Sequence, residues 1–116
     1  GRSKNMILGP SGENIYPEEI EEAINEHPDV LESLVYEQGG QICARVYLNY
    51  EELDHEFTSL KMSDSEIKAE IGKRLEELRI EVNSRLKSFS RINKIIEQTS
   101  PFEKTPTLKI KRFLYA

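Results

Sequence analysis

The chain has 116 residues, the length of one ordinary domain, and a domain of this size buries about two-thirds of its unfolded surface without needing a disulfide or a metal. It is 37% hydrophobic and 32% charged with a net charge of −5, which argues against general binding of nucleic acid. No run of about 18 apolar residues occurs, so no membrane-spanning helix is predicted. The one cysteine, Cys43, cannot form an internal disulfide, which fits a reducing compartment such as the cytoplasm.

The charge is distributed unevenly along the chain. Residues 1–12 hold two bases and no acid, and residues 101–116 hold four bases and one acid. Residues 13–100 hold 10 basic and 20 acidic side chains. Two basic ends therefore flank an acidic body, and they are either solvated termini or segments that meet phosphate or carboxylate groups.

Residues 1–16 are predicted to form a short hairpin. The apolar run at residues 6–8 and the extended residues 14–16 are separated by Gly9-Pro10-Ser11-Gly12, which is typical of a sharp reversal. On its own this turn is as compatible with a plain connector as with a binding site.

Residues 17–27 are predicted to form a helix. Pro17 suits its first position, because the N–H that proline lacks would be unpaired there, and Pro28 ends it. One buried face is marked by Ile20, Ala23 and Ile24. The five glutamates between residues 18 and 26 are interpreted as its solvated face.

Residues 30–37 and 41–50 are predicted to pair as antiparallel strands around Gly39-Gly40. In the second strand, alternate residues from Ile42 to Tyr50 form a core face, and the opposite face is half-polar. Cys43 lies on that opposite face and is interpreted as a structural thiol, because no neighbour in the sequence would activate it.

Residues 51–63 are predicted to be a polar loop with at most one helical turn. His55 lies in this loop and His27 precedes a proline, and neither is expected to be catalytic or to bind a metal, because no second ligand is close in the sequence.

A long helix is predicted from the capping box Ser63-Asp64-Ser65-Glu66 to about residues 86–89. Its apolar stripe is Ile67, Ile71, Leu75, Leu78, Val82 and Leu86. Residues 92–98 read as a further strand. The element order predicts an α+β fold, in which a small mixed or antiparallel sheet with an N-terminal hairpin packs against two main helices.

The C-terminal segment places a threonine-rich loop around Pro106 directly before Lys109, and a short helix is predicted to follow. Hydroxyls, free backbone N–H groups and a lysine on one loop suit an oxyanion or a phosphate. The alternative is an exposed basic terminus without a site.

Both ends of the chain carry a recognisable motif. The first comprises Gly1, Arg2, Lys4, Asn5, Met6, Ile7, Gly12, Ile15, Pro17, Glu19, Ile20 and Glu21, and the second is Thr-Pro-Thr-Leu-Lys-Ile-Lys-Arg at 105–112. They resemble the opening and closing motifs of the small C-terminal domain of acyl-adenylate-forming enzymes, which include acyl- and aryl-CoA synthetases, luciferases and peptide-synthetase adenylation domains. The closing motif and the 9–14 turn look most like the long-chain fatty acyl-CoA synthetase branch, although Leu108 stands where many members have glycine.

The resemblance implies that residues 1–116 are one domain, the mobile C-terminal domain of an ATP-dependent acyl-CoA synthetase whose large N-terminal adenylation domain is absent. A long-chain fatty acid–CoA ligase of this kind converts a fatty acid and ATP to acyl-AMP and then transfers the acyl group to CoA. ATP with Mg²⁺ and CoA are its co-substrates, and the isolated domain is expected to bind none of them tightly and to be inactive. The expected partners are the adenylation domain and the substrates, with no nucleic acid, and the expected location is the cytoplasm. Peripheral membrane contact of the parent is compatible with a lipid substrate.

The resemblance also assigns roles to single residues. Lys109 matches the catalytic lysine of acyl-AMP formation, Lys4 the hinge, and Arg2 a residue near the nucleotide. Gly9 and Gly12 would line the channel for CoA, and no metal site is expected. Two alternatives stay open: a related enzyme that loads a carrier protein or activates a shorter acid, and a non-catalytic interaction domain on the same scaffold.

Overall fold

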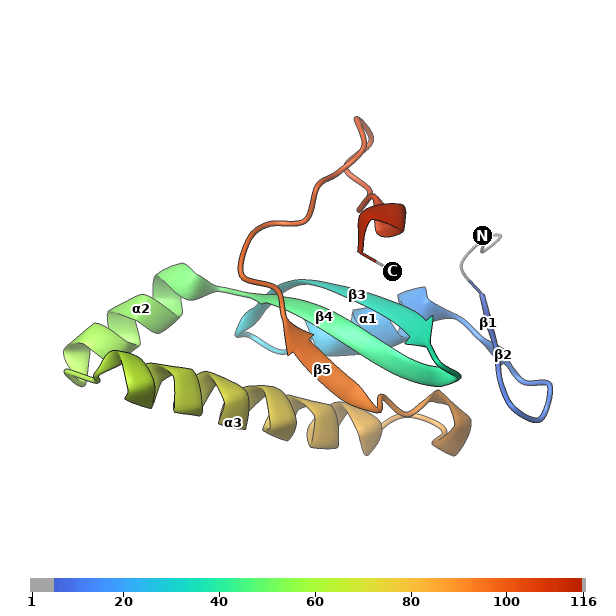
Figure 1. Ribbon diagram of the computed structural model, residues 1–116, viewed down its shortest axis with the longest axis horizontal. Helices are drawn as coiled ribbons and strands as arrows, with labels where there is room; N and C mark the ends of the chain where they lie inside the picture. Colours follow the sequence, from blue (N-terminus) through green and yellow to red (C-terminus); the bar gives the residue numbers. More distant parts are fainter. Residues whose placement is uncertain (1–5, 116) are drawn as a thin grey trace.

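The computed structural model describes residues 6–115 and has an α+β fold, as predicted (Figure 1). Within these residues the structure has two small sheets, three α-helices and two short 3-10 helices. The elements are β1 (Ile7–Leu8), β2 (Asn14–Ile15), α1 (Pro17–Asn25), β3 (Val30–Gln38), β4 (Gln41–Leu48), α2 (Tyr50–Ser59), α3 (Asp64–Asn83), η1 (Ser88–Ser90), β5 (Lys94–Glu97) and η2 (Arg112–Leu114).

The central sheet has the strand order β3-β4-β5 and is mixed. β3 and β4 form an antiparallel hairpin, in which Val35 lies opposite Ala44, and β5 joins β4 in parallel, with Ile95 opposite Ala44. β1 and β2 form a separate two-stranded antiparallel sheet, as the turn signal predicted. β3 is therefore an edge strand, and its outward N–H and C=O groups need partners from outside the sheet.

The main core lies between one face of the sheet and the helices α1 and α3. Side chains from the predicted faces meet there, including Ile24 of α1, Ala44 and Val46 of β4, and Leu78 and Val82 of α3. The capping box of α3 is present, with Ser63 Oγ accepting from the Glu66 N–H and Glu66 Oε1 accepting from the Ser63 N–H. No helix between residues 6 and 115 combines the length and the apolar run that crossing a membrane would require.

The opposite face of the sheet is covered by the C-terminal segment. A second apolar cluster of Leu34, Tyr36, Cys43 and Phe102 forms there, and Ile110 and Tyr115 pack against it. The Phe102 and Tyr115 rings meet edge to face, with their centroids 5.0 Å apart. Cys43 is buried in this cluster as a free thiol, so it has the packing role expected of it.

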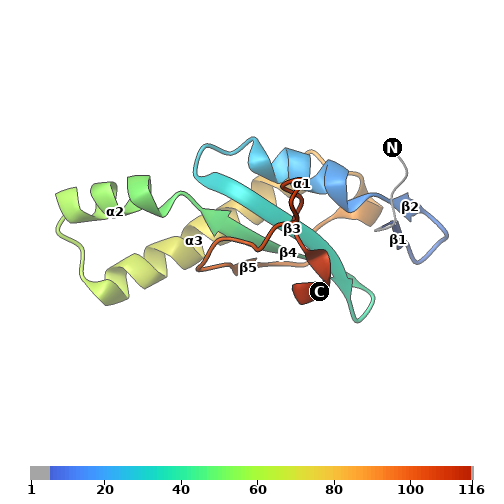
Figure 2. The same ribbon diagram turned by 90° about the horizontal axis from the view of Figure 1, so that it is seen from above.

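The prediction of a loop over residues 51–63 is wrong, because residues 50–59 form α2. Asn49 caps this helix by accepting from the Glu52 N–H, and Leu53 and Phe57, four residues apart, are both buried. Two buried apolar residues on an acidic helix make only a weak periodic signal. Figures 1 and 2 show α2 and the start of α3 extending together beyond one end of the sheet.

Helix α3 ends at Asn83, earlier than the predicted residues 86–89. At this end of the helix the Asn83 side chain binds a residue further along the chain: its Oδ1 accepts from the Ile92 N–H at 2.7 Å, and its Nδ2 donates to the Ile92 carbonyl at 3.0 Å. These two bonds hold the segment that leads into β5 against the end of the helix. Leu86 still packs against the core from outside the helix.

Candidate functional site

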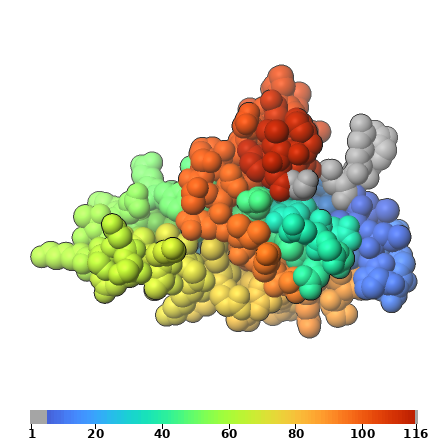
Figure 3. Space-filling model, viewed as in Figure 1, coloured from blue at the N-terminus to red at the C-terminus, as the bar shows by residue number. Residues whose placement is uncertain are grey.

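The C-terminal segment forms a small hairpin that projects from the body of the domain (Figure 3). Lys104 and Ile110 make an antiparallel bridge, and the Lys111 N–H donates to the Glu103 carbonyl at 2.8 Å. The two arms of this hairpin bracket residues 105–109, which form its tip. Lys109, the lysine that the sequence singled out, is therefore held at the tip of a hydrogen-bonded hairpin.

The tip is a three-residue loop closed by backbone hydrogen bonds. The Leu108 N–H donates to the Thr105 carbonyl at 2.8 Å, and the Thr105 N–H donates to the Lys109 carbonyl at 2.7 Å. Thr105 Oγ1 accepts from the Lys109 N–H at 3.2 Å and lies 3.0 Å from Thr107 Oγ1. Pro106 supplies the fixed φ of the first turn position. The threonines thus shape the loop internally instead of presenting all their hydroxyls to a ligand.

Leu108 closes this turn with a φ of +65°, in the left-handed region where glycine is favoured. The turn of the β1–β2 hairpin has the same hydrogen-bond pattern: the Gly12 N–H donates to the Gly9 carbonyl and the Gly9 N–H to the Glu13 carbonyl. Gly12, at the equivalent position, has a φ of +87°. Leu108 therefore adopts the left-handed conformation that a glycine has at the equivalent position of the other turn.

The amine of Lys109 is free to meet a ligand. The side chain is exposed, and among residues 6–115 no carboxylate makes an ion pair with it. Two of the three other bases of the hairpin arms are engaged: Lys104 Nζ pairs with Glu32 Oε2, and Arg112 Nη2 lies 2.7 Å from Glu21 Oε1, whereas Lys111, like Lys109, makes no ion pair among residues 6–115. Lys104 and Arg112 thus attach the hairpin to the body of the domain, and Lys109 and Lys111 stay available to a ligand.

The interpretation of the α1 glutamates as a solvated face is wrong for Glu21, which is buried. Its side chain lies on the buried side of the helix, where Oε2 accepts from the Val35 N–H at 2.7 Å and Oε1 accepts from Arg112. Burial raises the pKa of Glu21, and the bonds from Arg112 and the Val35 N–H oppose this rise. The sequence carried a signal for this: Glu21 lies four residues after Pro17 and three before Ile24, on the apolar stripe of the helix.

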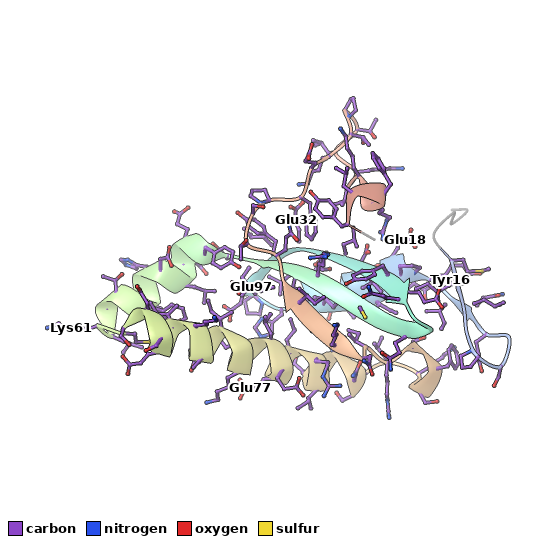
Figure 4. The ribbon with its side chains drawn as sticks, in the orientation of Figure 1. Tyr16, Glu18, Glu32, Lys61, Glu77 and Glu97 are labelled. Atoms are coloured by element: carbon purple, nitrogen blue, oxygen red, sulfur yellow. The ribbon has the colours of Figure 1, made fainter. Side chains whose placement is uncertain are left out.

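An open cleft of about 1100 Å³ separates the hairpin from α1 and β3. Its wall on the body side carries carboxylates from Glu18, Glu21 and Glu32, and the hairpin side carries Lys109 and Lys111. Figure 4 shows Glu18 and Glu32 on the side of the body that faces the C-terminal segment. Exposed apolar side chains, Leu31 and Phe113 among them, also line this cleft.

Of the other predicted site residues, the two that the structure describes do not join Lys109. Gly9 and Gly12 lie in the turn between β1 and β2, at a different part of the domain from the C-terminal hairpin (Figure 1). Arg2 and Lys4 lie outside the described residues. Within residues 6–115, no group of three or more His, Cys, Asp or Glu side chains is arranged to hold a metal ion. The two histidines belong to separate elements; His27 Nδ1 accepts from the Asp29 N–H after α1, and His55 lies on α2.

Comparison with known proteins finds acyl-activating enzymes. No family model matches the chain. A curated protein, medium-chain acyl-CoA ligase ACSF2, mitochondrial, of Rattus norvegicus, is 45% identical over 53 residues, covering 41% of this chain and 8% of that protein. The solved ATP-bound RpMatB-BxBclM chimera B1 is 28% identical with a TM-score of 0.67, and the match covers 98% of this chain and 20% of that one. A Mycobacterium tuberculosis fatty acyl CoA synthetase is 25% identical with a TM-score of 0.64, over 97% of this chain and 19% of that one.

The chain matches the C-terminal domain region of the AMP-binding acyl-CoA synthetase and ligase superfamily. It spans 8% of the curated relative and about a fifth of each solved structure, so it is similar to one part of proteins that are much longer. The resemblance drawn from the two end motifs therefore agrees with likeness in both sequence and fold.

Proposed function

We propose that this chain is the C-terminal domain of an ATP-dependent acyl-CoA synthetase, and that Lys109 is its catalytic residue for acyl-AMP formation. The observation that carries the proposal is an exposed lysine, without an ion-pair partner among residues 6–115, at the tip of a hydrogen-bonded hairpin, in a fold similar to that of solved acyl-CoA synthetases over 97–98% of this chain. The proposed partners are an adenylation domain in the same protein, ATP, a fatty acid and CoA.

The first half-reaction forms acyl-AMP. A carboxylate oxygen of the acid attacks the α-phosphorus of ATP, the new C(O)–O–P bond forms, and the bond to pyrophosphate breaks. Two anions approach each other in this step, so a cation that reaches both stabilises the transition state more than the separated reactants. Lys109 suits this role because its ammonium group is a compact charge on a long flexible stem.

The second half-reaction transfers the acyl group from AMP to the thiol of CoA. We propose that the domain turns about Lys4 between the two steps, that Arg2 approaches the nucleotide, and that Gly9–Gly12 borders the channel of the thiol. The proposal that different parts of the domain serve the two half-reactions is supported by the separate places of the Lys109 hairpin and the β1–β2 turn (Figure 1). Mg²⁺ would accompany ATP; no residues described here form a ligand set for it, and no step above is assigned to it.

The test is acyl-AMP formation in the protein that contains this domain together with its adenylation domain. ATP–pyrophosphate exchange should depend on a fatty acid, and Lys109→Ala should lower its rate by about a hundredfold or more, the usual cost of one transition-state contact of this kind. Lys111→Ala is the matched control, because it removes a lysine two residues along the same arm that is also unpaired within residues 6–115. Equal losses of rate in both variants, or an undiminished rate of ATP–pyrophosphate exchange in Lys109→Ala, would contradict a catalytic role for Lys109.

The acid itself has two candidates. The closing motif favours a long-chain fatty acid, whereas the curated relative with 45% identity is named a medium-chain ligase. Measuring kcat/KM for a series of medium- and long-chain acids with CoA as the acceptor distinguishes the two candidates. Repeating the series with an acyl carrier protein as the acceptor distinguishes a CoA ligase from a carrier-loading enzyme. We propose the cytoplasm as the place of action, on the basis of the single unpaired Cys43.

A further inference from the structure

The hairpin that carries Lys109 is attached to the edge of the sheet by a three-part cluster. β3 is an edge strand, and the N–H and C=O of its residue Val35 both have their hydrogen-bond partners outside the sheet. Glu21 Oε2 accepts from that N–H at 2.7 Å, Arg112 Nη1 donates to that carbonyl at 3.3 Å, and Arg112 Nη2 donates to Glu21 Oε1 at 2.7 Å. One carboxylate, one guanidinium and the backbone N–H and C=O of one residue thus form a closed ring of hydrogen bonds, which is called the Glu21–Arg112–Val35 cluster below.

This cluster joins residues that are far apart in the chain. Glu21 and Arg112 are 91 positions apart, and Arg112 follows Lys109 by three residues on the same arm of the hairpin. The two side chains are 11% and 23% exposed, so the pair is better shielded from water than the exposed ion pairs of α3. A planar guanidinium can donate to a carboxylate and a carbonyl at once, and this fixes direction as well as distance.

The other attachments of the hairpin are less directional. Lys104 meets Glu32 through a single point charge on the opposite arm, and these side chains are 34% and 21% exposed. Tyr115, which follows the hairpin, makes two further hydrogen bonds: its hydroxyl accepts from the Glu103 N–H, and its carbonyl accepts from Arg45 Nε. Arg112 is therefore the directional polar contact on the arm that carries Lys109.

We propose that Glu21 and Arg112 are positioning residues, which orient the Lys109 hairpin by clamping its outgoing arm to the edge of β3. The inference rests on the proposed function of Lys109, but it concerns two residues that need not touch a substrate. Loss of the clamp lets the tip move relative to the body, and a displacement of about 1 Å at a catalytic group lowers a rate about a hundredfold.

The first experiment measures acyl-AMP formation in the protein that contains both domains, for Arg112→Ala, Arg112→Lys and Glu21→Gln. We expect kcat to fall about 10- to 100-fold in Arg112→Ala with KM for ATP little changed, because alignment and not binding is lost. Arg112→Lys should recover only part of the rate, since an ammonium group cannot reproduce the fork. The matched control is Arg74→Ala, which removes an arginine that binds Glu56 and Glu70 on helices away from the cleft, and its kcat should stay near that of the wild type.

The second experiment measures amide hydrogen exchange of residues 103–111 in the same variants, and it does not depend on the reaction. Arg112→Ala should speed exchange in this segment, while Arg74→Ala should leave it unchanged. The proposal is overturned if Arg112→Ala leaves either the exchange or the rate unchanged, or if Arg74→Ala lowers the rate equally. If Lys109→Ala retains full activity while Arg112→Ala still frees the hairpin, the proposed role of Lys109 fails and the clamp itself stands.

Discussion

Replacing Leu108 with glycine should stabilise the hairpin that carries Lys109. Leu108 has a φ of +65°, a conformation that costs a residue with a β-carbon about 1–2 kcal/mol. Glycine avoids this cost but returns about 0.5–1 kcal/mol through the greater freedom of the unfolded chain. The leucine side chain is 78% exposed, so its removal sacrifices little packing. The balance is a gain of about 0.5–1 kcal/mol in the local stability of the hairpin.

The assay is amide hydrogen exchange at Thr105 and Lys111, whose N–H groups close the hairpin. A gain of this size slows their exchange about two- to fivefold. Leu108→Ala is the control, because alanine keeps the steric cost of the left-handed conformation and should give no such protection. The reverse substitution tests the same reasoning in the β1–β2 turn. Gly12→Ala adds a β-carbon at a residue with a φ of +87°, so it should destabilise the β1–β2 hairpin. Faster exchange in Leu108→Gly than in Leu108→Ala would refute the argument from backbone strain.

Three further predictions concern the scaffold. Phe57→Ala should cost about 3–5 kcal/mol in the free energy of unfolding measured with urea, because Phe57 is 1% exposed; a cost below about 1 kcal/mol would contradict the packing of α2. Gly72→Ala should raise that free energy by about 0.5–1 kcal/mol, because Gly72 lies within α3 and nothing lies within 4 Å of an added β-carbon; a loss would show an unrecognised contact. Burial raises the pKa of Glu21 in the folded protein above its ordinary 4.5. Between pH 4.5 and that raised pKa the folded protein binds more protons than the unfolded chain. The wild type should therefore lose stability relative to Glu21→Gln as the pH rises through this range. Urea titrations from about pH 4 to pH 7 measure this, and a relative gain would contradict the cause given for the pKa.

The elements that the sequence predicted correctly are those with strong local signals. The capping box located the start of α3, Gly39-Gly40 located the β3–β4 turn, and Pro17 located the start of α1. The helix α2 was missed because its buried side consists of only two apolar residues among acids, which is also the pattern of a polar loop.

The features that the sequence did not predict depend on contacts between distant residues. No local pattern specifies that β5 pairs in parallel with β4, or that the C-terminal segment covers the second face of the sheet. Glu21 could be recognised as unusual from its place on the apolar stripe of α1, but its partner Arg112 could not, because only the folded chain brings the two together. The same holds for the cleft, which is built from α1, β3 and the C-terminal hairpin.

The central claim, that this domain supplies Lys109 to one of two half-reactions, is tested most directly by measuring both with Lys109→Ala in the protein that contains the adenylation domain. Acyl-AMP formation is followed by ATP–pyrophosphate exchange, and thioester formation is started from supplied acyl-AMP and CoA. The account predicts that the first rate falls about a hundredfold or more while the second stays within a few-fold of the wild type. Equal loss of both rates, or loss of neither, would contradict it.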